Sequence, residues 1–175
     1  LVFRPFARPA DVFLSLNKPF SKVFETTSMV DFSGIRRHAE QHCHKLQKAL
    51  KPGIEEPTLE EIYDTVSLLY GYDREKLRII ENIEIENEIK FAYPRKSAVQ
   101  LFDMAKKAGK HVIVASDMYL PKSCIEKILT KCGVEGYEKL YLSSEMHLTK
   151  HSGRMFPAII SDLKEIAQSN QILHI

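Results

Sequence analysis

The sequence predicts an α/β fold in which a block of helices precedes a parallel sheet with crossover helices. Two observations predict this fold. From residue 10 to about residue 93 the apolar residues recur at helical spacing, whereas after Pro94 short β-branched segments alternate with helical ones. The connections between these later segments are short, which favours right-handed crossovers and parallel strands. We therefore expect a helical block over residues 10–93 and an α/β block over residues 94–175.

Composition and charge indicate an ordinary globular protein. The 175 residues are 44% hydrophobic and 27% charged, and the net charge is +2 with basic and acidic residues interspersed. This balance argues against a nucleic-acid partner. No apolar stretch reaches the roughly 18–20 residues that a membrane span needs. The three cysteines show no CxxC spacing, so we expect reduced thiols in a cytoplasmic protein with no membrane partner.

The first elements are expected from prolines and capping residues. Residues 1–9 are broken by prolines and predict an extended connector. Val12, Phe13 and Leu16 predict a short helix, which we expect Pro19 to stop. A polar helix is expected over residues 31–50, ended by Pro52 and Gly53.

Two further helices complete the block. Thr58 followed by Glu61 forms a capping box that opens a helix running to Gly71. Asp73 can cap the next helix, whose successive turns carry Leu77, Ile80, Ile83 and Glu84. We interpret three alternating acidic residues of this helix as a solvated face: Glu84, Glu86 and Glu88.

The α/β block is expected to alternate regularly. Ser97 can cap a helix that ends at Gly109, and the β-branched run of residues 111–116 predicts a strand buried on both faces. A helix over residues 121–132 ends at Gly133. The remaining expected elements are a strand over residues 140–142, a helix over residues 153–167 and a strand over residues 171–175.

Polar residues follow both of the first two strands, where parallel sheets bind their ligands. Ser116 and Asp117 come directly after one strand, and Lys150 lies in the segment after the next. A serine hydroxyl can bind a phosphoryl oxygen, a lysine supplies positive charge, and a helix start at Ser152-Gly153 adds partial charge. We predict phosphate binding at Ser116 and Asp117 and a catalytic, charge-offsetting role for Lys150. Asp117 could orient the loop, help to hold a metal-bound water, or be a simple turn residue.

These segments resemble motifs of the haloacid dehalogenase (HAD)-like hydrolases. Val-Ile-Val-Ala-Ser-Asp (residues 112–117) looks like motif II, and Lys150 in Leu-Thr-Lys-His-Ser-Gly-Arg-Met-Phe looks like the motif III lysine. Residues 1–4 resemble those just after motif I, and residues 172–175 resemble the strand before motif IV. The helical block lies where a C1-type cap is inserted, a match by position alone. The resemblance implies a partial Rossmann-like HAD core with an inserted α-helical cap.

The resemblance also implies a reaction. A HAD-like enzyme hydrolyses or transfers the phosphoryl group of a small phosphorylated substrate by attack of an aspartate carboxylate on phosphorus. Ser116 would hold the phosphoryl oxygens, Lys150 would offset their charge, and Mg²⁺ would bridge carboxylates and phosphate. The chain contains no Asp-x-Asp pair. We therefore expect the nucleophile, the general acid and most Mg²⁺ ligands to lie outside it, and we expect the chain alone to have no phosphatase activity.

Other interpretations of the sequence remain open. One is a non-catalytic HAD-like module of a larger protein, for example one of polysaccharide biosynthesis. A nucleotide-binding domain is another, although no glycine-rich loop follows a strand. His38 and His42 have the i, i+4 spacing of a metal pair, but no third ligand is visible, which favours a polar helix surface. Three arginines near the junctions could contact a leaving group or form hinge salt bridges: Arg4, Arg8 and Arg95.

Overall fold

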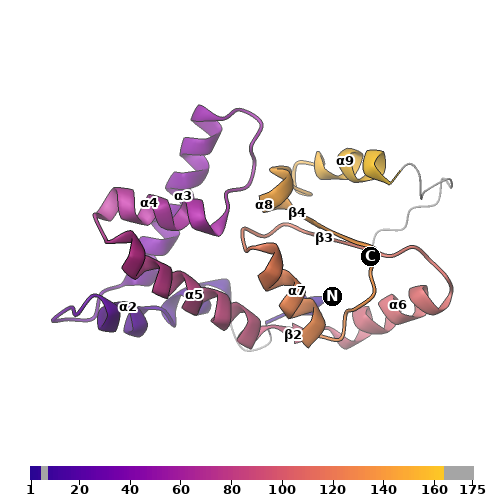
Figure 1. Ribbon diagram of the computed structural model, residues 1–175, viewed down its shortest axis with the longest axis horizontal. Coiled ribbons are helices and arrows are strands. Elements are labelled where there is room, and N and C mark those ends of the chain that lie inside the picture. Colours follow the sequence, from indigo (N-terminus) through magenta and orange to yellow (C-terminus); the bar gives the residue numbers. More distant parts are fainter. Residues whose placement is uncertain (5–7, 164–175) are drawn as a thin grey trace.

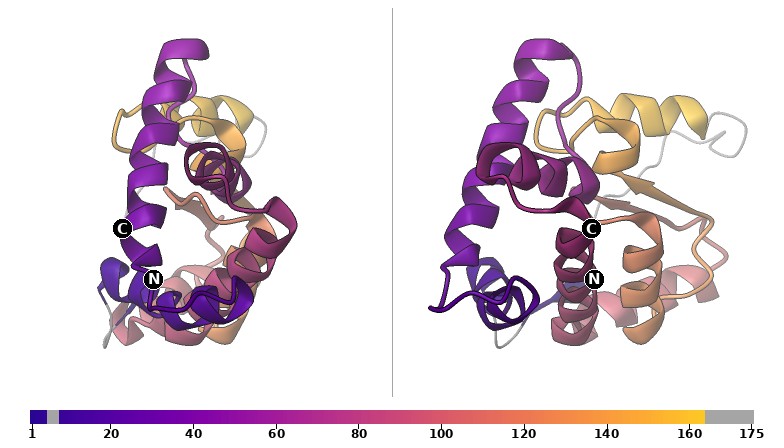
Figure 2. Two further views of the ribbon diagram at one scale, coloured as in Figure 1. Left: turned by 90° about the vertical axis from the view of Figure 1, so that its left-hand side faces the viewer. Right: turned by 60° about the vertical axis from the view of Figure 1, so that its left-hand side comes forward.

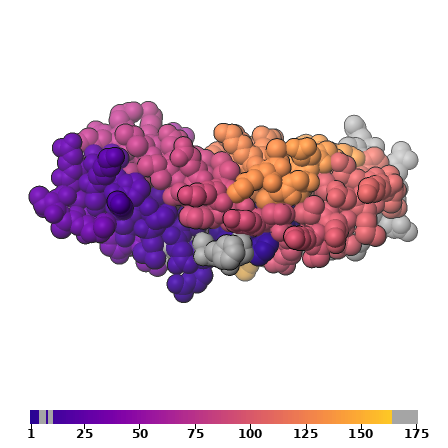
Figure 3. Space-filling model, turned by 90° about the horizontal axis from the view of Figure 1, so that it is seen from below, coloured from indigo at the N-terminus to yellow at the C-terminus, as the bar shows by residue number. Residues whose placement is uncertain are grey.

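In the computed structural model, which describes residues 1–4 and 8–163, the chain is mixed α/β and helices predominate (Figure 1). The helices of the first part, called the helical block below, are α1 (Pro9–Leu14), α2 (Asn17–Val23), α3 (Phe32–Leu50), α4 (Leu59–Tyr70) and α5 (Arg74–Phe91). The second part contains α6 (Lys96–Lys107), β3 (Ile113–Ser116), α7 (Lys122–Lys131), β4 (Lys139–Leu142), α8 (Ser143–Met146) and α9 (Met155–Asp162). Seen from below, the two parts form opposite ends of an elongated molecule (Figure 3).

The strands β3 and β4 pair in parallel, as the sequence predicts. Ile113 lies opposite Lys139 and Ser116 lies opposite Leu142, with α7 as the crossover between the strands. The strand predicted over residues 171–175, and the end of the helix predicted to run to residue 167, lie outside the described residues. Among the described helices, none combines the length and the apolar character that crossing a membrane requires.

A second, antiparallel pair joins the two ends of the helical block. In it, β1 (Val2–Phe3) lies beside β2 (Tyr93–Pro94), and the amide of Arg95 donates to the carbonyl of Leu1 at 2.9 Å. The connector predicted over residues 1–9 ends one residue earlier than expected, because α1 begins at Pro9. Because of this pairing, the chain leaves for the helical block and returns from it at neighbouring points.

Two N-terminal caps expected from the sequence, Asp73 and the Thr58–Glu61 capping box, are confirmed, and Asp31 is a further cap that was not expected. Asp31 accepts from the amide of Gly34 at 3.2 Å and Asp73 from that of Lys76 at 2.8 Å. Thr58 and Glu61 form the reciprocal capping box, with bonds of 3.2 and 2.9 Å between side chains and amides. Gly71 ends α4 with a φ of 70°, a left-handed conformation that glycine adopts at little cost.

Three expected helix boundaries are wrong. Pro19 does not stop a helix but is the third residue of α2. Proline is tolerated there because amides of the first turn have no acceptor within their own helix, so the missing N–H costs no hydrogen bond. Ser97 lies inside α6, because the helix begins directly after β2 with Arg95 at the N-cap. The helix expected at residue 153 begins instead at Met155. The preceding residues form a turn, closed by a 3.0 Å bond from the amide of Gly153 to the carbonyl of Lys150.

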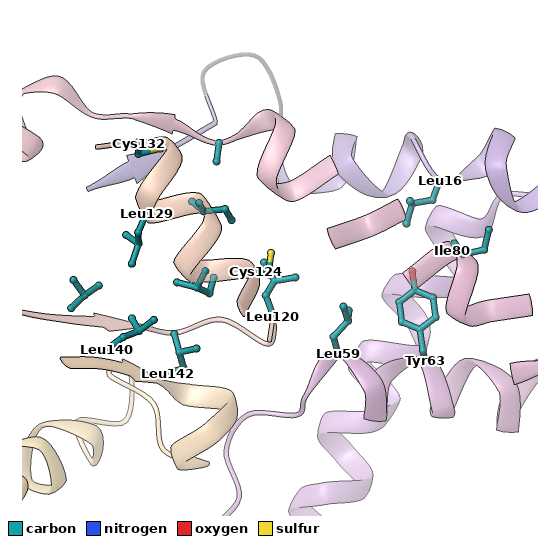
Figure 4. Packing of buried hydrophobic residues seen from close by; sticks show 14 of the residues in the cluster. Leu16, Leu59, Tyr63, Ile80, Leu120, Cys124, Leu129, Cys132, Leu140 and Leu142 are labelled. Atoms are coloured by element: carbon teal, nitrogen blue, oxygen red, sulfur yellow. The ribbon is translucent and has the colours of Figure 1, made fainter. Parts of the chain in front are cut away.

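One continuous apolar core joins the helical block to the sheet. In Figure 4, Leu16, Tyr63 and Ile80 lie at one end of this core, Leu59 and Leu120 near its middle, and Leu129, Leu140 and Leu142 at the other end. The helices α5 and α7 pack side by side across the junction (Figure 2). Full burial of each such leucine stabilises the fold by about 1.5–3 kcal/mol.

The expected solvated acidic face of α5 is wrong for two of its three residues. Glu86 is exposed, whereas Glu84 and Glu88 are 0% and 2% exposed. Glu84 accepts two 3.0 Å bonds from Arg36 of α3 and one of 2.7 Å from the hydroxyl of Tyr63. Glu84 and Glu88 continue the buried stripe of Leu77 and Ile80 along the helix, so their position on the helix, rather than their charge, decides their burial.

The interpretation of the junction arginines as salt-bridge residues is confirmed for two of them. Arg4 pairs with Glu88 of α5, and Arg8 pairs with Asp11 at 3.3 Å. Arg95 stacks its guanidinium over the ring of Phe3, 5.9 Å from the centroid. The first and third of these contacts lie at the β1–β2 junction.

Candidate functional site

The segments that follow β3 and β4 meet at the carboxyl ends of the two strands. Because the strands are parallel and in register at Ser116 and Leu142, residues 117–120 and residues 143–154 begin side by side. The helical block reaches the same place, since the amide of Leu59 donates to the carbonyl of Tyr119 at 2.9 Å. Residues 147–154, called the Lys150 loop below, therefore lie where open parallel sheets bind their ligands.

Ser116 and Lys150 lie close together at this edge. The Lys150 ammonium donates to the carbonyl oxygen of Ala115 at 3.1 Å, one residue before Ser116. Within residues 1–4 and 8–163, the hydroxyl of Ser116 has no hydrogen-bond partner, and its side chain is partly exposed. The structure thus places the ammonium of Lys150 at the end of the strand that carries Ser116.

Asp117 orients the Lys150 loop. Its two carboxylate oxygens accept from the amide of Lys150 at 2.9 and 3.0 Å, and one of them also accepts from the amide of His151 at 3.3 Å. Of the three roles considered for Asp117, the geometry supports the orienting one. Its carboxylate fixes the backbone from which the Lys150 side chain extends.

Two serines that the sequence analysis did not single out support the segment after β3. The Ser143 hydroxyl accepts from the amide of Met118 at 2.9 Å, and the Ser144 hydroxyl donates to the carbonyl of Leu120 at 3.4 Å. Both serines are buried in the short helix α8, which the sequence also did not reveal. Their signal was weak, because two serines after an apolar strand usually mark an ordinary turn.

Glu55, in the linker between α3 and α4, is a further residue that the sequence did not reveal. Its carboxylate accepts from the amide and the hydroxyl of Thr149 at 2.7 and 3.0 Å, and from the hydroxyl of Ser152 at 2.7 Å. Arg154 completes the group with an ion pair of 3.0 Å. The hydrogen bond from Ser152, supported by those from Thr149 and Arg154, lowers the pKa of Glu55 to about 2. These four residues are called the Glu55 cluster below.

The neighbouring Glu56 has the opposite electrostatic environment. It is half-buried, and among the described residues its carboxyl has no hydrogen-bond or ion-pair partner. Burial, together with the negative charges of Glu40 and Asp117, raises the pKa of Glu56 to about 7. A carboxyl with a raised pKa beside a strand-end loop is a common feature of functional sites.

The described residues do not form a metal site. In the part of the chain that the structure describes, no three histidine, cysteine, aspartate or glutamate residues lie so that they could hold a metal ion. His38 and His42 have ring centroids 6.1 Å apart, and His38 hydrogen-bonds the hydroxyl of Tyr70 at 2.8 Å. Asp117 directs its oxygens at backbone amides. These side chains therefore do not fit the Mg²⁺ that the family resemblance implies.

No protein-family model matches the chain, and comparison with curated proteins gives no significant match.

The site has the chemistry of an anion-binding edge. The hydroxyl of Ser116, which is free of partners in the part of the chain that the structure describes, and the ammonium of Lys150 are donors of the kind that bind phosphoryl oxygens. Charge-assisted bonds are stronger than neutral ones. The carboxylates of Asp117 and Glu55 are occupied by amides and hydroxyls of the Lys150 loop. These bonds hold the backbone of the loop that carries Lys150.

Proposed function

We propose that this chain supplies the phosphate-binding part of a HAD-like phosphohydrolase or phosphotransferase that acts on a small phosphorylated substrate. The observation that carries the proposal is the contact of the Lys150 ammonium with the end of β3, beside the hydroxyl of Ser116, which has no hydrogen-bond partner among the described residues. Ser116 ends β3 and Lys150 lies in the Lys150 loop, and in the proposal one tetrahedral anion binds both groups at this edge. Each charge-assisted hydrogen bond to such an anion contributes about 1.5–3 kcal/mol.

The arrangement of the helical block supports a capped, Rossmann-like core. The block begins and ends at the paired strands β1 and β2, as expected of an insertion into a core domain. Its linker over residues 51–58 reaches the Lys150 loop through Glu55. In the proposed enzyme the helical block would cover the bound substrate, exclude water and contribute to substrate choice.

In the proposed reaction, the carboxylate oxygen of an aspartate attacks phosphorus. The P–O bond to the leaving group breaks, and the oxygen of the leaving group takes up a proton. Water then hydrolyses the acyl phosphate and releases inorganic phosphate. The chain has no Asp-x-Asp pair, so we assign no nucleophile within it. Ser116 and Lys150 bind the phosphoryl oxygens throughout, and Asp117 holds Lys150 in place.

A phosphate titration tests the proposal. We expect inorganic phosphate to shift the NMR signals of Ser116 and Lys150. Ser116→Ala and Lys150→Met should each weaken phosphate binding by roughly 10- to 100-fold, the equivalent of one charge-assisted bond. Lys122→Met, at an exposed position of α7, is the matched control and should bind normally. Binding that is absent, or that is equal in all variants, would reject the phosphate site and favour a non-catalytic module.

An activity assay completes the test. With Mg²⁺ and an aryl phosphate, we expect no turnover by this chain, because it offers no paired-carboxylate nucleophile. Turnover that survives repurification and is lost in Lys150→Met would place the nucleophile within the chain.

A further inference from the structure

We propose that Glu55 is a positioning residue for Lys150. Through its contacts, Glu55 links the position of the helical block over the site to the position of the lysine. The role of Lys150 in phosphate binding rests on the proposed function. The positioning of its loop by Glu55 rests on the contacts alone.

The first observation is that Glu55 carries the whole polar connection between the helical block and the Lys150 loop. Among the described residues, every hydrogen bond and ion pair that joins these two segments involves Glu55. Its side chain binds Thr149, Ser152 and Arg154, and its amide donates to the carbonyl of His147 at 3.0 Å. Removing this one carboxylate would therefore leave a single backbone hydrogen bond between the two segments.

The second observation is the order of the contacts along the Lys150 loop. The amide of Thr149 donates to Glu55 at 2.7 Å, and the next amide, that of Lys150, donates to Asp117 at 2.9 Å. Two carboxylates, one from the helical block and one from the segment after β3, thus hold consecutive peptide groups. Asp117 holds the loop from the side of β3 and Glu55 holds it from the side of the helical block, so loss of Glu55 releases the residue directly before Lys150.

The third observation is that the Glu55 cluster is only partly shielded from water. The side chains of Glu55 and Arg154 are 20% and 54% exposed, and Ser152 is exposed. All of these groups can exchange their protein partners for water when the contact opens, so opening leaves no buried charge unpaired. The contact can therefore form and break within the native state, and Lys150 becomes fixed when the linker over residues 51–58 closes on its loop.

Amide hydrogen exchange measured by NMR tests the proposal on this chain. In Glu55→Gln we expect the Thr149 amide to exchange at least about tenfold faster, because local opening becomes easier. The NMR signal of the Lys150 Cε should move toward that of a lysine side chain in water. If Glu55 only stabilised the fold, its replacement would not shift this signal. Glu60→Gln makes the same charge change at an exposed position of α4 and should alter neither signal. Equal exchange in both variants would overturn the proposal.

A second variant keeps the test decisive if Glu55→Gln does not fold. Ser152→Ala removes the hydrogen bond that the exposed Ser152 hydroxyl donates to Glu55. This variant should accelerate the exchange of the Thr149 amide by a smaller factor than Glu55→Gln. If Ser152→Ala leaves the exchange of Thr149 unchanged, the proposal fails. Phosphate titration of the same samples separates the two hypotheses. Faster exchange without phosphate binding would reject the proposed function and keep the role of Glu55. Phosphate binding with unchanged exchange would do the reverse.

Discussion

Two clusters pair a carboxylate with an arginine from a distant part of the chain, and they differ in their exposure to water. In the Arg36 cluster, Arg36 and Glu84 are 0% exposed, and the guanidinium lies 5.0–5.6 Å from the ring centroids of Phe13, Tyr63 and Tyr119. In the Glu55 cluster, the side chains of Glu55 and Arg154 are 20% and 54% exposed. The first cluster must stay paired for the fold to persist, whereas the second can open. The same pair of residue types therefore serves stability in one place and local motion in the other.

The physical reason is the cost of leaving a charge unpaired. A buried charge that loses its partner cannot turn to water, so the loss destabilises the fold strongly. In the Arg36 cluster, burial acts to lower the pKa of Arg36, but the charge of Glu84 and the neighbouring Tyr119 and Tyr63 outweigh burial and raise it. The guanidinium therefore stays charged. A partly exposed pair exchanges protein contacts for hydration, and its net contribution is small.

The largest effect is expected from breaking the Arg36 cluster. Arg36→Met leaves Glu84 buried without its cation, and we expect it to lower the free energy of unfolding by about 3–5 kcal/mol, measured by urea denaturation. Arg37→Met, at the exposed neighbouring position, should cost little. Adding Glu84→Leu to Arg36→Met should recover part of the loss, because the unpaired charge disappears. A loss as small as that of Arg37→Met would mean that the pair is dispensable.

An intermediate effect is expected at Glu56, and its sign depends on pH. The folded-state pKa of Glu56 is raised from 4.5 to about 7, so the carboxyl favours folding only while it is protonated and disfavours folding at higher pH. Glu56→Gln should therefore stabilise the protein at pH 8 by about 1 kcal/mol, after allowance for screening by solvent. The gain should shrink as the pH falls through 7 and disappear below 4.5. A gain independent of pH would contradict this assignment.

The smallest effect is expected from the Glu55 cluster, with the opposite pH dependence. Because the pKa of Glu55 is lowered from 4.5 to about 2, its contribution to stability is complete above pH 4.5 and is lost as the pH falls toward 2. The difference in unfolding free energy between wild type and Glu55→Gln should therefore be constant from pH 8 to pH 5 and shrink below that. A difference that shrinks near pH 7 instead would assign the titration to Glu56.

The same contrast explains which parts of the site could be predicted from sequence. Ser116 ends β3, Asp117 follows it, and Lys150 lies in the segment that follows β4, so the parallel order of β3 and β4 places all three at one edge of the sheet. Glu55 lies 94 residues from Thr149 in the sequence, in a linker whose local pattern marks only a helix end. Its contacts depend on how the helical block packs, which no local signal contains.

For the helices, the sequence determined what depends on neighbouring residues. The caps at Asp31, Thr58 and Asp73 form because a side chain and an amide three residues later are always close. The expectation that Pro19 stops a helix is wrong, because the effect of a proline depends on where the helix begins and Pro19 falls in the first turn of α2.

By itself, then, the sequence determined most of the helices, the caps at Thr58 and Asp73 and the parallel β3–β4 pair, because these follow from periodicity and short-range hydrogen bonding. Only the tertiary structure decided that Glu84 and Glu88 are buried, that β1 pairs with β2, and that Glu55 binds the Lys150 loop. Each of these depends on residues that are distant in the sequence becoming neighbours. The free energy of a charged group depends on those neighbours and on its access to water, and the amino-acid pattern around one residue specifies neither.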